Sequence, residues 1–187
     1  MARLLSAPGA GLDREPVVSP AIPGLALSEL AAVDMQDANR LLVEWDHDLG
    51  PCRRPFGMEA FALLVRGQAV AVAVSASTVS ATVAGYRRDQ VVELARQAAG
   101  NEWANRVMIR LWREVCAPAW KHWPVLAAVS YSLHTKSGNL YRFDGWERAA
   151  NNAGSAGGGT WSRQRDASER LAGKKTLWVW RYVPANP

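Results

Sequence analysis

The sequence predicts an α/β fold, in which helices cover a mixed β-sheet. Short runs of β-forming residues alternate along the chain with segments whose apolar residues recur at helical spacing. Turns that contain Gly and Pro separate these segments. The expected order is strand, helix, hairpin, strand, helix, strand, short helix and strand, an alternation typical of α/β proteins. With 187 residues, the chain is long enough for one such domain with its own core.

Local signals place each element in turn. Asp34 precedes an apolar stripe at helical spacing and is typical of a helix cap, whereas Gly50 and Pro51 end that helix. The turn at 66–68 separates two β-runs and predicts an antiparallel hairpin, and residues 75–85 fit either an extension of it or a loop. The expected strands are 25–31, 61–65, 69–76, 91–95, 125–131 and 176–183, and the expected helices are 35–49, 102–117 and 139–143.

The composition narrows the class of protein. Residues 1–24 are rich in Ala, Gly and Pro and are expected to form a disordered or loosely packed arm, with the folded domain at 25–187. No run approaches the roughly 20 apolar residues of a membrane-spanning helix, so no membrane partner is expected. Cys52 and Cys116 are interpreted as reduced thiols, which indicates a cytoplasmic protein. No two histidines have the spacing of a metal site, so no metal is expected.

Positive charge is concentrated near the C-terminus. From residue 142 onward, eight Lys or Arg stand against four Asp or Glu, so this region carries +4 of the net charge of +5. A basic region that also contains aromatic residues suits an anionic partner such as DNA. A solvated surface explains the same charges, and on charge alone it is the favoured interpretation.

The segment 91–116 is the first candidate site. A strand, a loop and a helix start direct backbone N–H groups toward a ligand at the positive end of the helix dipole, which favours phosphate or pyrophosphate. We expect Asn101 to cap this helix, Gly100 to permit close approach and Arg96 to supply a fixed charge. An ordinary strand–helix connection is the alternative, because the Gly-rich spacing of a P-loop or dinucleotide fingerprint is missing.

A second candidate site lies at 137–146, where the sequence reads SGNLYRFDGW. This segment resembles the GNAT acyltransferase pattern of Asn, then Leu-Tyr, then Gly with an aromatic residue. The resemblance implies a GNAT-like mixed sheet and acetyl-CoA or another acyl-CoA as cofactor, with Asn139 on the cofactor side. It also implies that Tyr141 protonates the departing coenzyme A thiolate. Simple packing of Tyr141 under the sheet is the alternative.

A narrower resemblance connects five short segments to the GNAT-like branch that includes the phage DNA-modification protein Mom. These segments are EWDHDLGP at 44–51, ELAR at 93–96, VSY at 129–131, LYR at 140–142 and GGTWSR at 158–163. The resemblance implies functional roles for His47 and Arg96 and the modification of adenine in DNA. The basic C-terminal region would suit DNA through contacts with phosphates.

The leading hypothesis is therefore an acyl-CoA-dependent transferase that modifies a nucleobase amine in DNA. In this mechanism the thioester lies between the strands that end at Arg96 and Tyr131, and His47 or a water removes the proton of the acceptor. His47 has two alternatives, a metal ligand and a surface histidine at a helix end. The expected contacts with the acceptor are Trp161, which would stack on a flipped base, Arg163 and Arg165. A flexible hairpin turn whose Trp161 covers the core is the alternative, and it is slightly favoured.

Two other functions stay open. The usual GNAT pyrophosphate signature is absent, and Gly100 is followed by Asn101 and Glu102 instead. This favours a non-catalytic, GNAT-shaped protein that binds nucleic acid. The other function is N-acetylation of a small molecule or a protein, with no role for nucleic acid.

Overall fold

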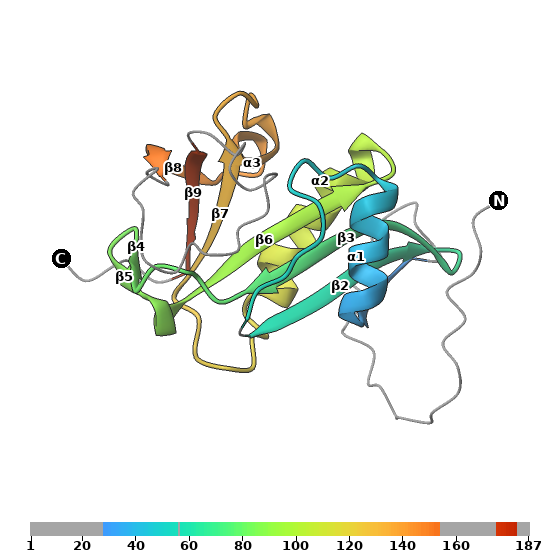
Figure 1. The fold of residues 1–187 in the computed structure, drawn as a ribbon, viewed down its shortest axis with the longest axis horizontal. Coiled ribbons are helices and arrows are strands. Elements are labelled where there is room, and N and C mark those ends of the chain that lie inside the picture. Colours follow the sequence, from blue (N-terminus) through green and yellow to red (C-terminus); the bar gives the residue numbers. More distant parts are fainter. Residues whose placement is uncertain (1–27, 56, 154–174, 183–187) are drawn as a thin grey trace.

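The computed structural model describes residues 28–55, 57–153 and 175–182 (Figure 1). Its elements are β1 (Ser28–Val33), α1 (Met35–Glu44), β2 (Met58–Val65), β3 (Gln68–Ala76), β4 (Thr82–Val83), β5 (Tyr86–Arg87), the short 3-10 turn η1 (Arg88–Gln90), β6 (Val91–Ala99), α2 (Glu102–Leu111), the π-helical turn η2 (Trp112–Cys116), β7 (Ala127–Leu133), α3 (Asn139–Phe143), β8 (Glu147–Ala153) and β9 (Lys175–Arg181). The predicted arm at 1–24 lies outside the described residues, as do Trp161, Arg163 and Arg165.

Seven of the strands form one mixed sheet. Their order is β1-β2-β3-β6-β7-β9-β8, and β4 pairs with β5 in a separate ribbon. The pair β6–β7 is parallel, and all the other neighbours in the sheet are antiparallel. The α/β fold class, with a mixed central sheet and flanking helices, is thereby confirmed.

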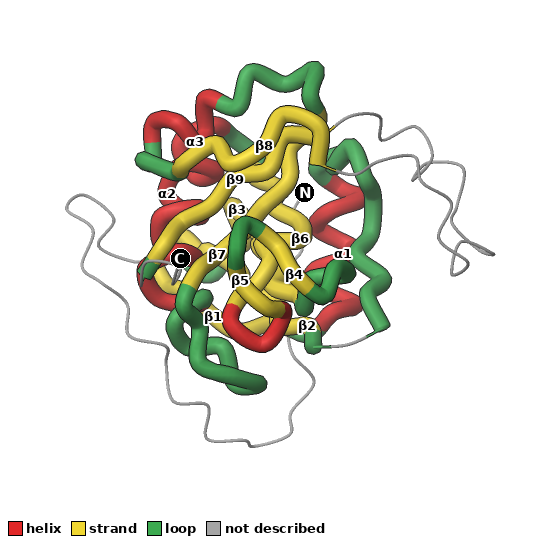
Figure 2. The backbone as a smooth tube through the Cα atoms, turned by 90° about the vertical axis from the view of Figure 1, so that its left-hand side faces the viewer, coloured by secondary structure: helices red, strands yellow, loops and turns green. Residues whose placement is uncertain are grey.

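The two longer helices cover opposite faces of the sheet, as Figure 2 shows from the side. The apolar stripe of α1 packs its buried Leu41 and Leu42 against Val72 and Val74 of β3. The stripe of α2 packs instead against the alternate residues of the strands, because successive side chains of a strand point to opposite faces. We call these the α1 face and the α2 face.

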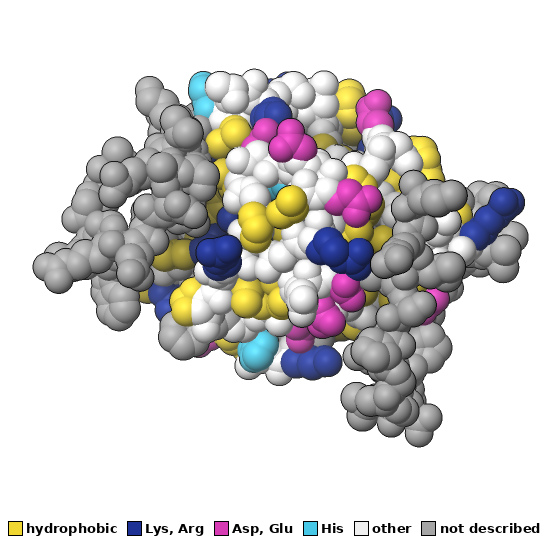
Figure 3. Space-filling model, turned by 45° about the vertical axis from the view of Figure 1, so that its right-hand side comes forward, with side chains coloured by type: hydrophobic (Ala, Val, Ile, Leu, Met, Phe, Trp, Pro, Cys, Tyr) yellow, Lys and Arg dark blue, Asp and Glu magenta, His cyan; other side chains and the backbone are white. Residues whose placement is uncertain are grey.

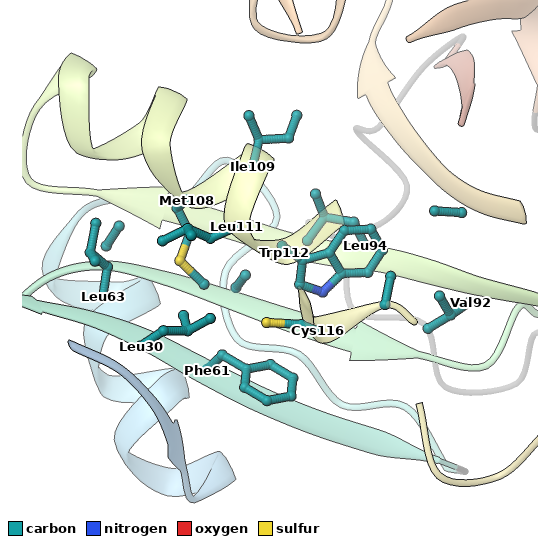
Figure 4. Packing of buried hydrophobic residues seen from close by; sticks show 14 of the residues in the cluster. Leu30, Phe61, Leu63, Val92, Leu94, Met108, Ile109, Leu111, Trp112 and Cys116 are labelled. Carbon is teal, nitrogen blue, oxygen red and sulfur yellow. The ribbon is translucent and has the colours of Figure 1, made fainter. Parts of the chain in front are cut away.

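A buried tryptophan organises the core on the α2 face. Trp112 is fully buried among Leu94, Met108 and Leu111 (Figure 4). Its indole Nε1 donates a hydrogen bond of 2.8 Å to the hydroxyl of Ser75, so the one polar atom of the ring is satisfied inside the core. The core therefore fixes η2 directly under β3 and β6.

Helix starts follow the caps that the sequence indicates. The carboxylate of Asp34 accepts a hydrogen bond from the amide of Asp37 at 2.7 Å, and α1 begins at Met35 as expected. The Asn101 side chain accepts from the amide of Ala104 at 3.0 Å, which confirms Asn101 as the cap of α2. Each cap satisfies one of the amides that have no partner within the helix.

Two features differ from the expectation. The strand β8 lies where the sequence predicted no strand, and its sequence, ERAANNA, has few strand-forming residues. It forms because it pairs with the aromatic strand β9. The helix predicted at 102–117 also changes at Trp112 into the π-helical turn η2, in which Arg113 is buried.

Candidate functional site

The two parallel strands at the centre of the sheet separate near their carboxyl ends. Pairing between β6 and β7 runs from Val91 with Ala127 to Leu94 with Ser130. Beyond this point β6 continues beside β3 as far as Ala99, and β7 continues beside β9. Each strand keeps its outer neighbour and loses its inner one, so Figure 1 shows the two arrows diverging. The strands run on to Ala99 and Leu133 instead of ending at Arg96 and Tyr131, and their pairing with each other ends at Leu94 and Ser130.

A β-bulge in β6 accounts for this divergence. Val74 of β3 faces Arg96, whereas the next residue, Ser75, faces Leu94, so Ala95 has no counterpart in β3. A bulge bends the strand that carries it and increases its twist. The bend falls immediately after Leu94, where the pairing with β7 ends, and it turns the rest of β6 away from β7. Backbone groups on the two facing edges are thereby left for another partner.

The hydroxyl of Tyr141 lies at the point where the strands separate. The Ser130 hydroxyl donates to the carbonyl oxygen of Leu94 at 3.0 Å, which joins β7 to β6 at their last pair. The Tyr141 oxygen is 2.9 Å from the same Ser130 oxygen. Since the proton of Ser130 is directed to Leu94, Tyr141 is the donor in this second bond. Burial raises the pKa of Tyr141, so its hydroxyl stays protonated and able to donate at neutral pH.

Aromatic rings hold the side chain of Tyr141. Its ring stacks on Trp178 of β9 at 5.2 Å and meets Trp146 edge-on at 5.6 Å. Gly138 makes this packing possible, since a Cβ atom there would lie 2.3 Å from the Trp178 ring and its φ is +67°. The loop after β7 can thus cross directly over Trp178. Asn139 follows at the start of α3, where it is exposed.

At the start of α2, the outward-pointing amides favour an anion, and Glu102 opposes one. The amide of Gly100 donates to Val70, and the Trp45 indole lies beside this glycine, 3.4 Å from the position of a Cβ atom. Asn101 satisfies the amide of Ala104, which leaves the amides at the head of the helix pointing outward. Glu102 stands in the first turn, paired with Arg106, so a diphosphate must compete there with a carboxylate.

Arg96 lies on the α1 face, beside the cluster that contains Ala95 and Val74. Its guanidinium donates to the carbonyl oxygens of Ala95 at 2.7 Å and Gly50 at 3.3 Å. These bonds hold the loop between α1 and β2 against the bulge of β6. The role of Arg96 as a fixed charge for a ligand at the head of α2 stays a prediction.

His47 is arranged as a neutral imidazole. Its Nδ1 accepts a hydrogen bond from the amide of Leu49 at 3.1 Å, so in the neutral ring the proton is on Nε2. Burial and the neighbouring Arg96 lower the pKa of His47 to about 4. As arranged, the ring has no open basic nitrogen with which to take a proton from an acceptor.

The pH dependence of stability tests this description of His47. An unfolded histidine has a pKa near 6.5, above the folded value of His47. The contribution of His47 to the free energy of unfolding is therefore fully present above pH 6.5 and is lost as the pH falls toward 4. In His47→Asn the side-chain oxygen can replace Nδ1 but does not titrate. As the pH falls over this interval, we expect the free energy of unfolding of this variant to decrease by roughly 2 kcal/mol less than that of the wild type. Urea unfolding measured from pH 7 to 4 gives this difference. His134→Asn, at an exposed position, is the control, and an unchanged pH dependence in His47→Asn would contradict the account.

The sequence interpretation missed a buried acid on the α1 face. Glu93 of β6 is 4% exposed and accepts a hydrogen bond of 2.7 Å from Arg54. Burial raises the pKa of Glu93, and Arg54 opposes that rise. Tyr131 lies on the same face of β7, where burial first and then Glu93 raise its pKa to about 12. One acidic residue within the apolar run VVELA was the signal in the sequence.

The described ranges were also searched for a metal cluster, a membrane-spanning helix and a basic surface. No group of three or more His, Cys, Asp or Glu side chains there is arranged to hold a metal ion. None of the described helices is long and apolar enough to cross a lipid bilayer. On the face that Figure 3 presents, basic and acidic side chains are interspersed.

Solved structures share this fold, although no protein-family model and no curated protein matches the sequence. An Escherichia coli N-acetyltransferase that acts on an alanine of a ribosomal protein gives a TM-score of 0.53 at 10% identity, over 86% of this chain and 97% of the other. A mutant spermidine N-acetyltransferase from Vibrio cholerae gives a TM-score of 0.52 at 9% identity, over 83% of this chain and 94% of the other. A Bacillus subtilis acetyltransferase in complex with coenzyme A gives a TM-score of 0.50 at 11% identity, over 84% of this chain and 99% of the other.

The likeness covers nearly the whole of each neighbour and most of this chain. The fold of this chain is that of the GNAT acetyltransferases. At about 10% identity the likeness establishes the fold and leaves the reaction to be argued from the site.

Proposed function

We propose that the chain is an acyl-CoA-dependent N-acyltransferase that acylates an amine. The observation that carries this proposal is the hydroxyl of Tyr141 at the point where β6 and β7 diverge. Acetyl-CoA, or another acyl-CoA, supplies the acyl group as an activated thioester. The described residues fit such a group, since the facing edges of β6 and β7 have no ladder pairing with each other beyond Leu94 and Ser130, an arrangement that suits the amides of its long arm. The head of α2 suits its diphosphate, in competition with Glu102.

Tyr141 acts as the general acid in this proposal. The amine nitrogen forms a bond to the acyl carbon, the bond from that carbon to sulfur breaks, and the sulfur leaves with the electron pair. Tyr141 turns its hydroxyl proton from Ser130 to this sulfur and then recovers a proton from water, while Trp178 and Trp146 hold its ring in place. The excess proton of the amine passes to water, because His47 has its Nδ1 engaged and its Nε2 protonated. The products are an amide and the free thiol.

Calorimetric titration with acetyl-CoA tests the proposal first. We expect binding with a Kd between about 1 µM and 1 mM, in the range usual for enzyme substrates. Release of free thiol, followed with a panel of amines, then tests transfer. The panel contains spermidine and a peptide with N-terminal alanine, the acceptor types of two structural neighbours, and single-stranded DNA that contains adenine. If acetyl-CoA does not bind, the proposal fails and a non-catalytic binding protein of the same fold takes its place.

Transfer to a nucleobase of DNA stays a prediction from the sequence resemblance. Three residues on which it depends, Trp161, Arg163 and Arg165, lie outside the described ranges. The charges on the face in Figure 3 are of mixed sign, so the described part of that face adds no basic surface of the kind that DNA requires. The geometry at Tyr141 favours acylation of an amine without specifying which molecule carries it.

A further inference from the structure

An ion pair joins the two sides of the divergence beyond the last pair of β6 with β7. The ammonium group of Lys136 lies 3.1 Å from a carboxylate oxygen of Asp48. Lys136 belongs to the loop that follows β7, and Asp48 belongs to the loop between α1 and β2. Figure 1 shows both loops at the end of the sheet where β6 and β7 separate. The two side chains thus connect segments that the sheet itself no longer holds together.

Asp48 occupies a turn that is attached to β6. The amide of Gly50 donates to the carbonyl oxygen of His47 at 2.7 Å, and the amide of Leu49 donates to the His47 imidazole at 3.1 Å. The carbonyl oxygen of Gly50 accepts in turn from Arg96, which follows the bulge in β6. This turn is therefore fixed over the diverging part of β6, on the α1 face.

Lys136 occupies an exposed loop. The side chains of residues 134–137 are exposed, and the amide of Lys136 donates to the carbonyl oxygen of Leu133, the last residue of β7, at 3.0 Å. Gly138 ends this loop in close contact with β9. Between these two ends, the ion pair attaches the loop to the opposite side of the divergence. The turn on the β6 side is a fixed support, whereas the loop on the β7 side is the part that can move.

The two faces of the divergence have different roles in the proposed reaction. Tyr141 packs against the cluster on the α2 face, and the helix whose head suits the diphosphate lies on that face too. The amine must approach the acyl carbon from a side that the departing sulfur and its proton donor do not occupy. The α1 face meets this requirement, and the turn that carries Asp48 lies on it.

We propose that Asp48 and Lys136 form an electrostatic strap over the α1 face of the divergence, which closes the entrance for the acceptor and opens to admit the amine. This inference rests on the proposed function and concerns the control of access to the same site. The side chains of Asp48 and Lys136 are 49% and 57% exposed, so water and salt screen their attraction. Exposed pairs of this kind are weak enough to open in ordinary thermal motion. The strap therefore delays entry without blocking it.

Spin-label distances test whether the strap exists. Nitroxides at Glu44→Cys and Thr135→Cys, both at exposed positions, report the separation of α1 from the loop after β7, and both native cysteines are buried. We expect Lys136→Asp, which places two carboxylates opposite each other, to raise the population with the longer distance about two- to fivefold. The double variant Asp48→Lys/Lys136→Asp restores an ion pair with the charges exchanged, and it should restore the wild-type distances.

Acceptor kinetics test whether the strap controls entry. At low ionic strength, we expect kcat/KM for the acceptor amine to rise about two- to fivefold in Lys136→Asp and in Asp48→Lys alike, because each variant breaks the pair. Simple attraction of a charged amine would instead give effects of opposite sign, since the two variants change the local charge in opposite directions. The exchanged pair should return kcat/KM to the wild-type value. Arg66→Asp, in the exposed β2–β3 turn, is the matched charge control and should behave as the wild type.

Unchanged spin-label distances in Lys136→Asp would show that the ion pair does not hold the loop. A kcat/KM that stays at the wild-type value, falls, or changes in opposite directions in the two single variants would show that the pair does not control entry. If Lys136→Asp does not fold, Lys136→Gln removes the charge, and the same expectations and contradictions apply to it. Titration of acetyl-CoA into the wild type separates the claims. Absence of that binding contradicts the proposed function, whereas the spin-label distances still decide whether the strap exists.

Discussion

Replacing Tyr141 with phenylalanine is expected to lower kcat for acyl transfer about 100-fold or more, the usual range for loss of a general acid. Phenylalanine keeps the ring that stacks on Trp178 and meets Trp146, so packing is preserved and only the hydroxyl is lost. The hydroxyl is hydrogen-bonded to Ser130, the last residue of β7 that pairs with β6. Affinity for acetyl-CoA should stay within about threefold, because the lost bond acts on the departing sulfur.

Steady-state kinetics with the best amine of the panel, together with calorimetry, measure both quantities. Tyr86→Phe is a suitable control, since Tyr86 is also a buried tyrosine and packs in a separate cluster with Val83 and Val91. It should retain a kcat close to that of the wild type. If kcat of Tyr141→Phe also stays within about threefold of the wild type, Tyr141 is not the acid.

The second large effect is expected at Asp144. Its carboxylate accepts from Arg113 at 2.8 Å, from Arg110 at 3.1 Å and from the Trp146 indole at 3.0 Å. Arg113 is also buried, with its guanidinium 3.8 Å from the Trp180 ring. Asp144→Ala would leave that charge with only Glu114, an exposed carboxylate 3.2 Å away, as its ionic partner. We expect a loss of about 3–5 kcal/mol in the free energy of unfolding, the cost typical of a broken buried pair.

Urea unfolding of Asp144→Ala beside Asp89→Ala isolates the effect of burial. Asp89 pairs with Arg87, and their side chains are 59% and 69% exposed. Loss of this exposed pair should cost less than about 1 kcal/mol. Equal losses in the two variants would show that the buried pair does not stabilise the connection between η2 and α3. That connection matters for function because α3 carries Tyr141.

Local signals predicted much of the fold. Asp34 and Asn101 cap helices where the sequence placed them, and the turn at 66–68 joins β2 to β3. These features depend on residues close together in the chain. The strand β8 was missed because its own residues do not favour a strand, and its partner β9 lies beyond a long intervening segment. Pairing with a distant strand supplied what local preference lacked.

The site was only partly predictable for the same reason. The position of Tyr141 agrees with the motif that predicted its role, and the role itself stays a proposal. The bulge in β6 places Ala95 and Arg96 together on the α1 face, and the π-helical turn carries Arg113 into the core; neither irregularity has a local signal in the sequence. The pairing of Arg54 with Glu93 joins residues 39 positions apart, which no local pattern indicates.

Amide hydrogen exchange with and without acetyl-CoA tests the central claim most directly, namely that the diverging edges of β6 and β7 receive an acyl-CoA. The account predicts slower exchange on binding at 95–99 and 131–133, where each strand lacks its inner neighbour, and in the first turn of α2. Exchange in β1 and β2, at the far side of the sheet, should not change. Unchanged exchange along the diverging edges at saturating acetyl-CoA would contradict the account.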